Sequence, residues 1–247
     1  MPCNVNKSLL EDNMFVFLPV KIESGHNSGG LPIANIAVVA VNLVIFILSR
    51  TTGIRTVGFV FDVFTYAFVH VNIWHLIGNM WILWVFGNKL NTRVGNLLYA
   101  FIYLGTAAGM GIILRVLLRI DAAGASGVIF AVLAITLILM PGAMISVLCI
   151  AFFPVSLLIG LFSRPRHWIL LLMRWGQFKI KGVWGLLIIP VFELWSLIWQ
   201  GFNWTNLGHL LGLACGIGIV LLLPKRISMN IDAGTMDCPD QMKRNFI

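Results

Sequence analysis

The stretch Asp121-Ala-Ala-Gly-Ala-Ser-Gly-Val-Ile-Phe130 places Ser126 among small residues at the start of an apolar run that extends to Met140. Small residues let membrane helices approach closely, so packing alone is the common reason for such a sequence. Two other apolar stretches change this interpretation. They are His70-Val-Asn-Ile-Trp-His75-Leu-Ile-Gly-Asn79 and Gly208-His209-Leu-Leu-Gly212. Because polar groups are costly inside a membrane, polar residues in three separate apolar segments predict a functional site.

The composition is that of an integral membrane protein. Of 247 residues, 59% are hydrophobic and only 11% are charged, whereas a soluble domain carries about 25% charged residues. The length suits one bundle of about six spans. We interpret the net charge of +8 as a determinant of topology and not as a sign of nucleic-acid binding. The four cysteines show neither paired nor metal-site spacing, so no metal site is expected.

Three regions follow from the distribution of polar residues. Residues 1–30 form a polar segment without the pattern of a cleaved signal peptide, and we expect them in the cytoplasm. Residues 31–223 are expected to form the membrane domain, and residues 224–247 a cytoplasmic tail. The apolar runs predict spans at Pro32–Ser49, Ile73–Leu90, Leu97–Leu118, Ser126–Met140, Val183–Trp199 and Thr205–Leu223.

A further apolar run, Met144–Phe162, decides between six spans and seven. With six spans and a cytoplasmic N-terminus, thirteen Lys and Arg residues lie on the cytoplasmic side and four outside, which satisfies the positive-inside rule. A seventh span would move four of the thirteen outside. We therefore expect an all-α membrane protein, a bundle of six transmembrane helices, with Met144–Phe162 interfacial or re-entrant between helices four and five.

The same topology brings Ser126 and His209 to one depth. Ser126 lies roughly 22 Å along its helix from Pro141, and His209 roughly 21 Å from Leu223, at 1.5 Å per residue. Serine is a weak nucleophile until a base takes its proton, and the strip Gly208, Gly212, Gly216 would let the two helices close. The alternative is a histidine that only bridges two helices by a hydrogen bond.

Donors for an oxyanion are also present. His75 and Asn79 are four residues apart, hence on one helix face, and the Ser126 N–H lies at a helix start. No carboxylate is placed to complete a triad, since Asp62 and Asp121 fall in loops and Glu193 lies in the fifth span. The sequence predicts a Ser–His dyad, with Glu193 given no catalytic role.

In order and spacing, these motifs resemble the rhomboid family of intramembrane serine proteases. The similarity runs from about Thr65 through Leu223. It implies six helices around a water-filled cavity and cleavage of transmembrane protein substrates in or near their membrane segment, without a cofactor. Carried over, Ser126 is the nucleophile, His209 the general base, and His75, Asn79 and the Ser126 amide the oxyanion hole. The resemblance assigns supporting roles to His70, Gly124, Gly127, Phe130 and Gly212.

This chain departs from the family pattern at three places. The first loop lacks the frequent Trp-Arg pair, Phe130 stands where tyrosine is common, and Gly208 stands where alanine is usual. Two other functions stay open: a non-catalytic relative that binds transmembrane helices, and a transporter with a polar path past His75, Asn79 and His209. The sequence leaves the oligomeric state undecided.

Overall fold

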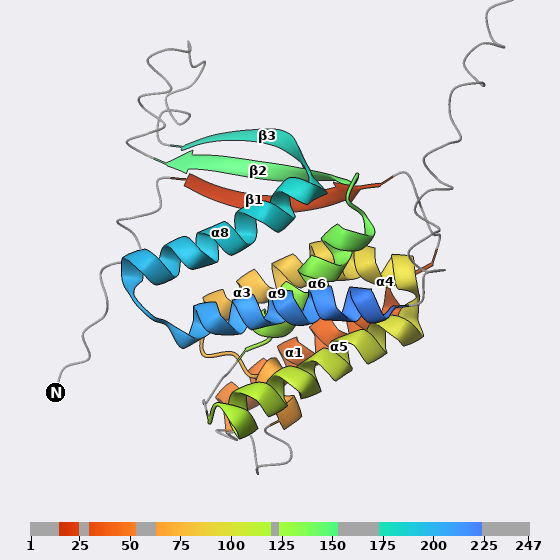
Figure 1. Ribbon diagram of the computed structural model, residues 1–247, viewed down its shortest axis with the longest axis vertical. Coiled ribbons are helices and arrows are strands. Elements are labelled where there is room, and N and C mark those ends of the chain that lie inside the picture. The colour runs from red at the N-terminus through yellow and green to blue at the C-terminus, as the bar shows by residue number, and fades with distance from the viewer. Residues whose placement is uncertain (1–14, 25–29, 53–62, 120–123, 153–172, 224–247) are drawn as a thin grey trace, which may run out of the picture. The chain divides into compact units, whose positions relative to one another are not determined.

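The computed structural model describes residues 15–24, 30–52, 63–119, 124–152 and 173–223. Within these ranges the chain forms two compact units, one of strands and one of helices, each described here by itself. The helical unit (Figure 1) contains α1 (Ile33–Thr52), η2 (Tyr66–Phe68), α3 (Ile73–Ile82), η3 (Leu83–Gly87), α4 (Asn88–Val94), α5 (Asn96–Gly111), η4 (Ile112–Leu117), α6 (Ser126–Leu139), α8 (Gly182–Gln200) and α9 (Trp204–Leu222).

The helices coincide with the expected spans to within a few residues. In the described part of the chain, α1, α5 with η4, α8 and α9 are each long and apolar enough to cross a membrane, and α6 is a shorter apolar helix. The second expected span is a continuous run of α3, the π-helical η3 and α4. The structure therefore confirms a mostly helical membrane protein, while the count of six spans stays a prediction.

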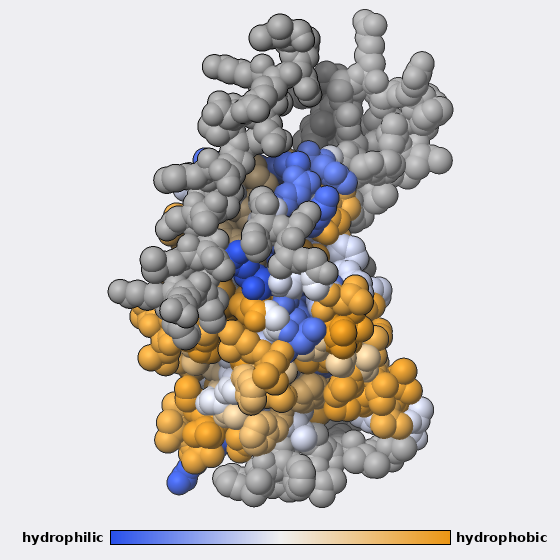
Figure 2. Space-filling model, turned by 90° about the vertical axis from the view of Figure 1, so that its right-hand side faces the viewer, coloured by the Kyte–Doolittle hydropathy of each residue, from blue (hydrophilic) through white to orange (hydrophobic). Residues whose placement is uncertain are grey.

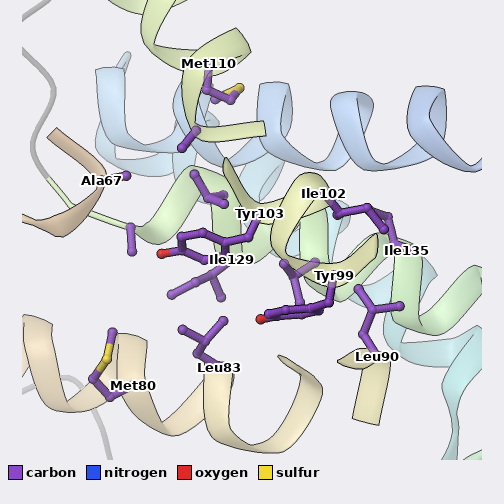
Figure 3. Close-up of a cluster of buried hydrophobic side chains, with 14 of the residues drawn as sticks. Ala67, Met80, Leu83, Leu90, Tyr99, Ile102, Tyr103, Met110, Ile129 and Ile135 are labelled. Carbon is purple, nitrogen blue, oxygen red and sulfur yellow. The ribbon is translucent and has the colours of Figure 1, made fainter. Parts of the chain in front are cut away.

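The α6 helix lies at the centre of the helical core. Every residue from 131 to 137 is buried, as expected for a helix that is apolar on all faces. Ile129 of α6 packs in a cluster with Leu83 of η3 and with Tyr99 and Tyr103 of α5 (Figure 3). Neighbouring helices thus hold α6, and with it Ser126, from several sides.

The outer helices expose large apolar side chains. Phe101 of α5, Trp199 of α8 and Leu222 of α9 are 68%, 77% and 86% exposed, and apolar residues cover much of the coloured surface in Figure 2. An exposed apolar surface of this extent is unfavourable in water but suits lipid. The helical unit therefore has the surface of a membrane-embedded bundle.

Asn35 fastens the first helix to the second span. Its Nδ2 donates to the Leu83 carbonyl (3.0 Å) and to Asn88 Oδ1 (2.7 Å), and its Oδ1 accepts from the Tyr99 hydroxyl. Leu83 opens the π-helical turn, where the regular i→i−4 bonding is interrupted. A buried amide thus satisfies a backbone group in the span that carries His75 and Asn79.

The second unit is a three-stranded sheet in the order β1–β2–β3, formed by β1 (Phe15–Glu23), β2 (Met144–Phe152) and β3 (Met173–Lys181). β1 pairs with β2 antiparallel, with a register shift between Pro19 and Lys21, where proline has no N–H to donate. Glu23 accepts from Lys179 at 2.6 Å, and the rings of Phe17 and Phe178 meet edge to face.

The expectation of an all-α chain is wrong for this unit. Residues 1–30 contain β1, and the described half of the Met144–Phe162 run is a strand, not a membrane helix. The periodicity of a continuous apolar run does not distinguish strand from helix, and the partner of β2 lies more than a hundred residues away. The interfacial or re-entrant placement of this run stays a prediction, and residues 153–172 lie outside the described part.

Candidate functional site

Helices α6 and α9 are in direct backbone contact. A Cβ atom built on Gly212 would lie 2.0 Å from the Gly127 carbonyl oxygen, and one on Gly216 would lie 2.6 Å from that of Ala131. Only glycine fits at such an approach. The structure therefore confirms that Gly212 and Gly216 let the helices of Ser126 and His209 close. Gly208 is different, since a Cβ there would meet nothing within 4 Å.

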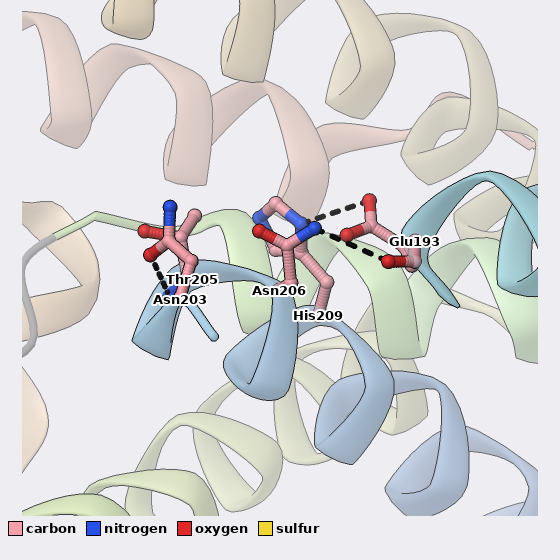
Figure 4. Close-up of polar contacts among 5 residues, drawn as sticks. All are labelled: Glu193, Asn203, Thr205, Asn206 and His209. Atoms are coloured by element: carbon pink, nitrogen blue, oxygen red, sulfur yellow. Dashed lines mark hydrogen bonds and ion pairs between the residues drawn. The ribbon is translucent and has the colours of Figure 1, made fainter. Parts of the chain in front are cut away.

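The His209 side chain is held on two sides. Its ring stacks on Phe130 of α6, with centroids 4.1 Å apart and planes 6° from parallel. Its Nδ1 lies 3.0 Å from Glu193 Oε1 on α8 (Figure 4). Phe130 thus stacks on the His209 ring without the hydroxyl that a tyrosine would add. The stacking on Phe130 and the hydrogen bond to Glu193 together fix the orientation of the His209 ring.

Ser126 is the first residue of α6 and is partly exposed. The structure shows no hydrogen bond between the described side chains of Ser126 and His209. Their neighbours in sequence do come together: a Cβ built on Gly127 would lie 3.3 Å from the Gly208 carbonyl oxygen. Catalytic hydrogen bonds are often long in ligand-free enzymes. Ala125 at the N-cap supplies no side-chain bond, so this helix start offers backbone N–H donors.

The expected oxyanion donors form a cluster with His70. Asn79 and His70 are buried, and Asn79 Nδ2 donates to His70 Nε2 at 3.0 Å. His70 Nδ1 lies 3.3 Å from the Phe68 carbonyl oxygen, and the His70 ring meets the His75 ring edge-on at 5.3 Å. One amide hydrogen of Asn79 is thereby engaged, and the second is left for another acceptor. His70 thus orients Asn79 as well as the loop before α3.

Gly124 joins this cluster to the serine loop. Its φ of +116° favours glycine, and a Cβ there would lie 2.6 Å from His75 Cε1. Its N–H donates to the Tyr66 carbonyl oxygen of η2 at 2.8 Å. The His75 ring therefore lies against the backbone two residues before Ser126.

The sequence interpretation missed the contact of Glu193 with His209. Glu193 on α8 lies against His209 on α9, and the two helices are joined by a three-residue turn; the Ser–His dyad itself stays a prediction. Glu193 lies seven residues before the end of α8 and His209 five residues after the start of α9, roughly 10 Å and 8 Å along the helices. Counting residues from the turn in the two expected spans would therefore have indicated that Glu193 and His209 lie close together.

None of the described residues forms a group of three or more His, Cys, Asp or Glu side chains that could hold a metal ion. The site contains a hydroxyl, an oriented imidazole and several hydrogen-bond donors, which are the groups that acyl transfer requires.

Comparison with known families agrees with this geometry. The model of the Rhomboid domain matches residues 57–226, which is more than half of the chain and includes every residue of the candidate site. Comparison with the curated proteins found no match. The chain is thus an integral membrane protein, and it belongs to the rhomboid family.

Proposed function

We propose that this protein is an intramembrane serine endopeptidase that cleaves transmembrane protein substrates in or near their membrane segment. Members of the rhomboid family are generally serine intramembrane proteases. The observation that carries the proposal for this chain is the contact of α6 with α9 at Gly127 and Gly212. This contact supports the proposal because Gly127 follows Ser126 directly and Gly212 lies one helical turn after His209.

In the proposed reaction Ser126 Oγ attacks the scissile carbonyl carbon while His209 takes the hydroxyl proton. The negative charge that develops on the carbonyl oxygen is met by donors from His75, Asn79 and the Ser126 N–H. His209 then gives its proton to the leaving amine, and water hydrolyses the acyl-enzyme with His209 again as base. No cofactor takes part.

The proposal includes the six-span topology, with both termini in the cytoplasm and the site opening toward the outer side. Chemistry on a peptide bond inside a bilayer needs water at the serine, and Ser126 is partly exposed. The outer apolar side chains of α5, α8 and α9 provide the surface along which a substrate helix would approach in the plane of the bilayer.

Labelling with a fluorophosphonate probe tests this function. The detergent-solubilised chain should be labelled, and Ser126→Ala and His209→Ala should each abolish labelling while retaining the wild-type melting temperature within about 2 °C. A folded wild type that stays unlabelled would exclude an activated serine. The remaining function would then be a non-catalytic protein that binds transmembrane helices.

A further inference from the structure

We infer that Glu193 is a positioning residue of the site: its carboxylate holds His209 in the orientation and tautomer in which Nε2 accepts the Ser126 proton. The inference rests on the proposed protease function and adds a third member to a site for which the sequence indicates only two. Its basis is the contact of Glu193 Oε1 with His209 Nδ1 at 3.0 Å.

Burial gives this contact a definite chemical meaning. Both side chains are only 16% exposed. In the inferred role the Glu193 carboxylate is ionised and has acceptor sites only, so the hydrogen in this bond belongs to His209 Nδ1. In neutral imidazole the lone pair then lies on Nε2. The bond therefore selects the tautomer that a general base requires.

The fold fixes Glu193 at this position. α8 and α9 are joined by the short turn Gly201–Asn203, where Gly201 has a φ of +82°. Asn203 caps α9 by accepting from the Thr205 N–H at 2.9 Å. Asn206 Nδ2 donates to the backbone carbonyl of Glu193 at 3.3 Å, as Figure 4 shows. A carboxylate on this turn of α8 has the His209 ring as its neighbour across the hairpin.

The surroundings of His209 explain why the carboxylate matters. Phe130 fixes the ring plane by stacking but leaves the ring free to turn within that plane. Among the described residues near His209, Glu193 on α8 and His75 on α3 are the titratable groups. When His209 takes a proton, Glu193 provides the negative charge that stabilises the imidazolium.

The test is the second-order rate constant of fluorophosphonate labelling of the full-length protein between pH 5 and 9. Glu193→Gln keeps the side-chain volume but removes the charge, and its amide can donate to Nδ1 and so favour the wrong tautomer. We expect labelling to slow by at least about tenfold. The pH at which the rate falls to half its plateau should move to a lower value, because the imidazolium has lost its counter-charge.

Two further variants separate positioning from packing. Asn206→Ala removes the hydrogen bond to the Glu193 backbone carbonyl but keeps the carboxylate, so it should slow labelling less than Glu193→Gln does and should leave the acid limb of the pH profile in place. Glu193→Asp keeps the carboxylate and should retain more of the wild-type labelling rate than Glu193→Gln does, because the charge beside His209 is still present.

The inference is overturned if Glu193→Gln labels at the wild-type rate, if the acid limb of its pH profile does not move, or if Glu193→Asp loses as much of the rate as Glu193→Gln. A loss in Asn206→Ala equal to that in Glu193→Gln would also overturn it, in favour of helix packing. An unlabelled wild type overturns the protease function and this role together, whereas a labelled wild type with an unaffected Glu193→Gln overturns this role alone.

Discussion

Gly212→Ala should disable the site by separating two helices. The added Cβ would lie 2.0 Å from the Gly127 carbonyl oxygen, whereas ordinary van der Waals contact begins near 3.4 Å. The difference, 3.4 − 2.0 = 1.4 Å, must come from movement of the backbones, since a carbonyl oxygen has no rotamer to change. Overpacking of this kind costs about 1–3 kcal/mol of stability.

The effect on activity should exceed the effect on stability. A displacement of about 1 Å between reacting groups can lower a rate by about 10²-fold, and Gly127 adjoins Ser126. We expect Gly212→Ala to slow fluorophosphonate labelling by about that factor, with a fall in melting temperature of a few degrees.

Gly208→Ala provides the matched control, because it lies one turn earlier on α9 and its Cβ would meet nothing within 4 Å. Alanine also favours the helix by up to about 1 kcal/mol over glycine, so this variant should keep wild-type labelling and stability. Equal labelling of Gly212→Ala and Gly208→Ala would refute the argument that close approach of α6 and α9 builds the site.

Two further predictions concern the histidines. Phe130→Ala should slow labelling by about three- to tenfold, because ring stacking contributes about 0.5–1.5 kcal/mol. Phe130→Tyr keeps the ring and should label within about twofold of wild type. An unchanged rate in Phe130→Ala would contradict a role for the stacking. Burial, together with the neighbouring His75, lowers the pKa of His70, in the loop before α3, to about 4. The unfolded chain, with a pKa of about 6.5, binds this proton first, so stability is complete above pH 6.5 and is lost as the pH falls toward 4. Melting temperatures over this range should therefore fall in wild type and fall less in His70→Gln; parallel curves would show that His70 does not contribute.

The helices of the membrane domain were predictable because their signal is local. About twenty apolar residues in succession suffice to indicate a span, and α1, α8 and α9 begin and end within a few residues of the expected limits. The second span was expected as one helix, and the π-helical turn at η3 inside it was not. That turn depends on Asn35, whose amide reaches Leu83 across 48 positions of sequence, and no local pattern contains such a contact.

The sheet could not be predicted for the same reason. β2 was recognised as apolar, but its conformation is decided by pairing with β1, from Phe15 opposite Ala151 to Glu23 opposite Met144. Strand pairing over such a separation leaves only weak traces in either segment: β1 carries Lys21, Glu23 and a proline, which made it resemble a polar tail. The pKa of Glu23 is lowered by its hydrogen bond to Lys179, a contact between segments that have no relation in sequence.

Some contacts of the candidate site follow from the positions of residues along their expected spans. Gly212 and Gly216 indicated that the helices of Ser126 and His209 would meet, as the structure shows, whereas the equal depth of the two side chains in the membrane stays a prediction. The same reasoning extends to Glu193, which is the only carboxylate in the six expected spans. A carboxylate inside an apolar helix requires a partner, and in a hairpin with a three-residue turn the candidates are the polar groups at matching distance from that turn. His209 satisfies this condition on α9, so asking which group satisfies Glu193 leads to the imidazole by an argument independent of any expected catalytic role.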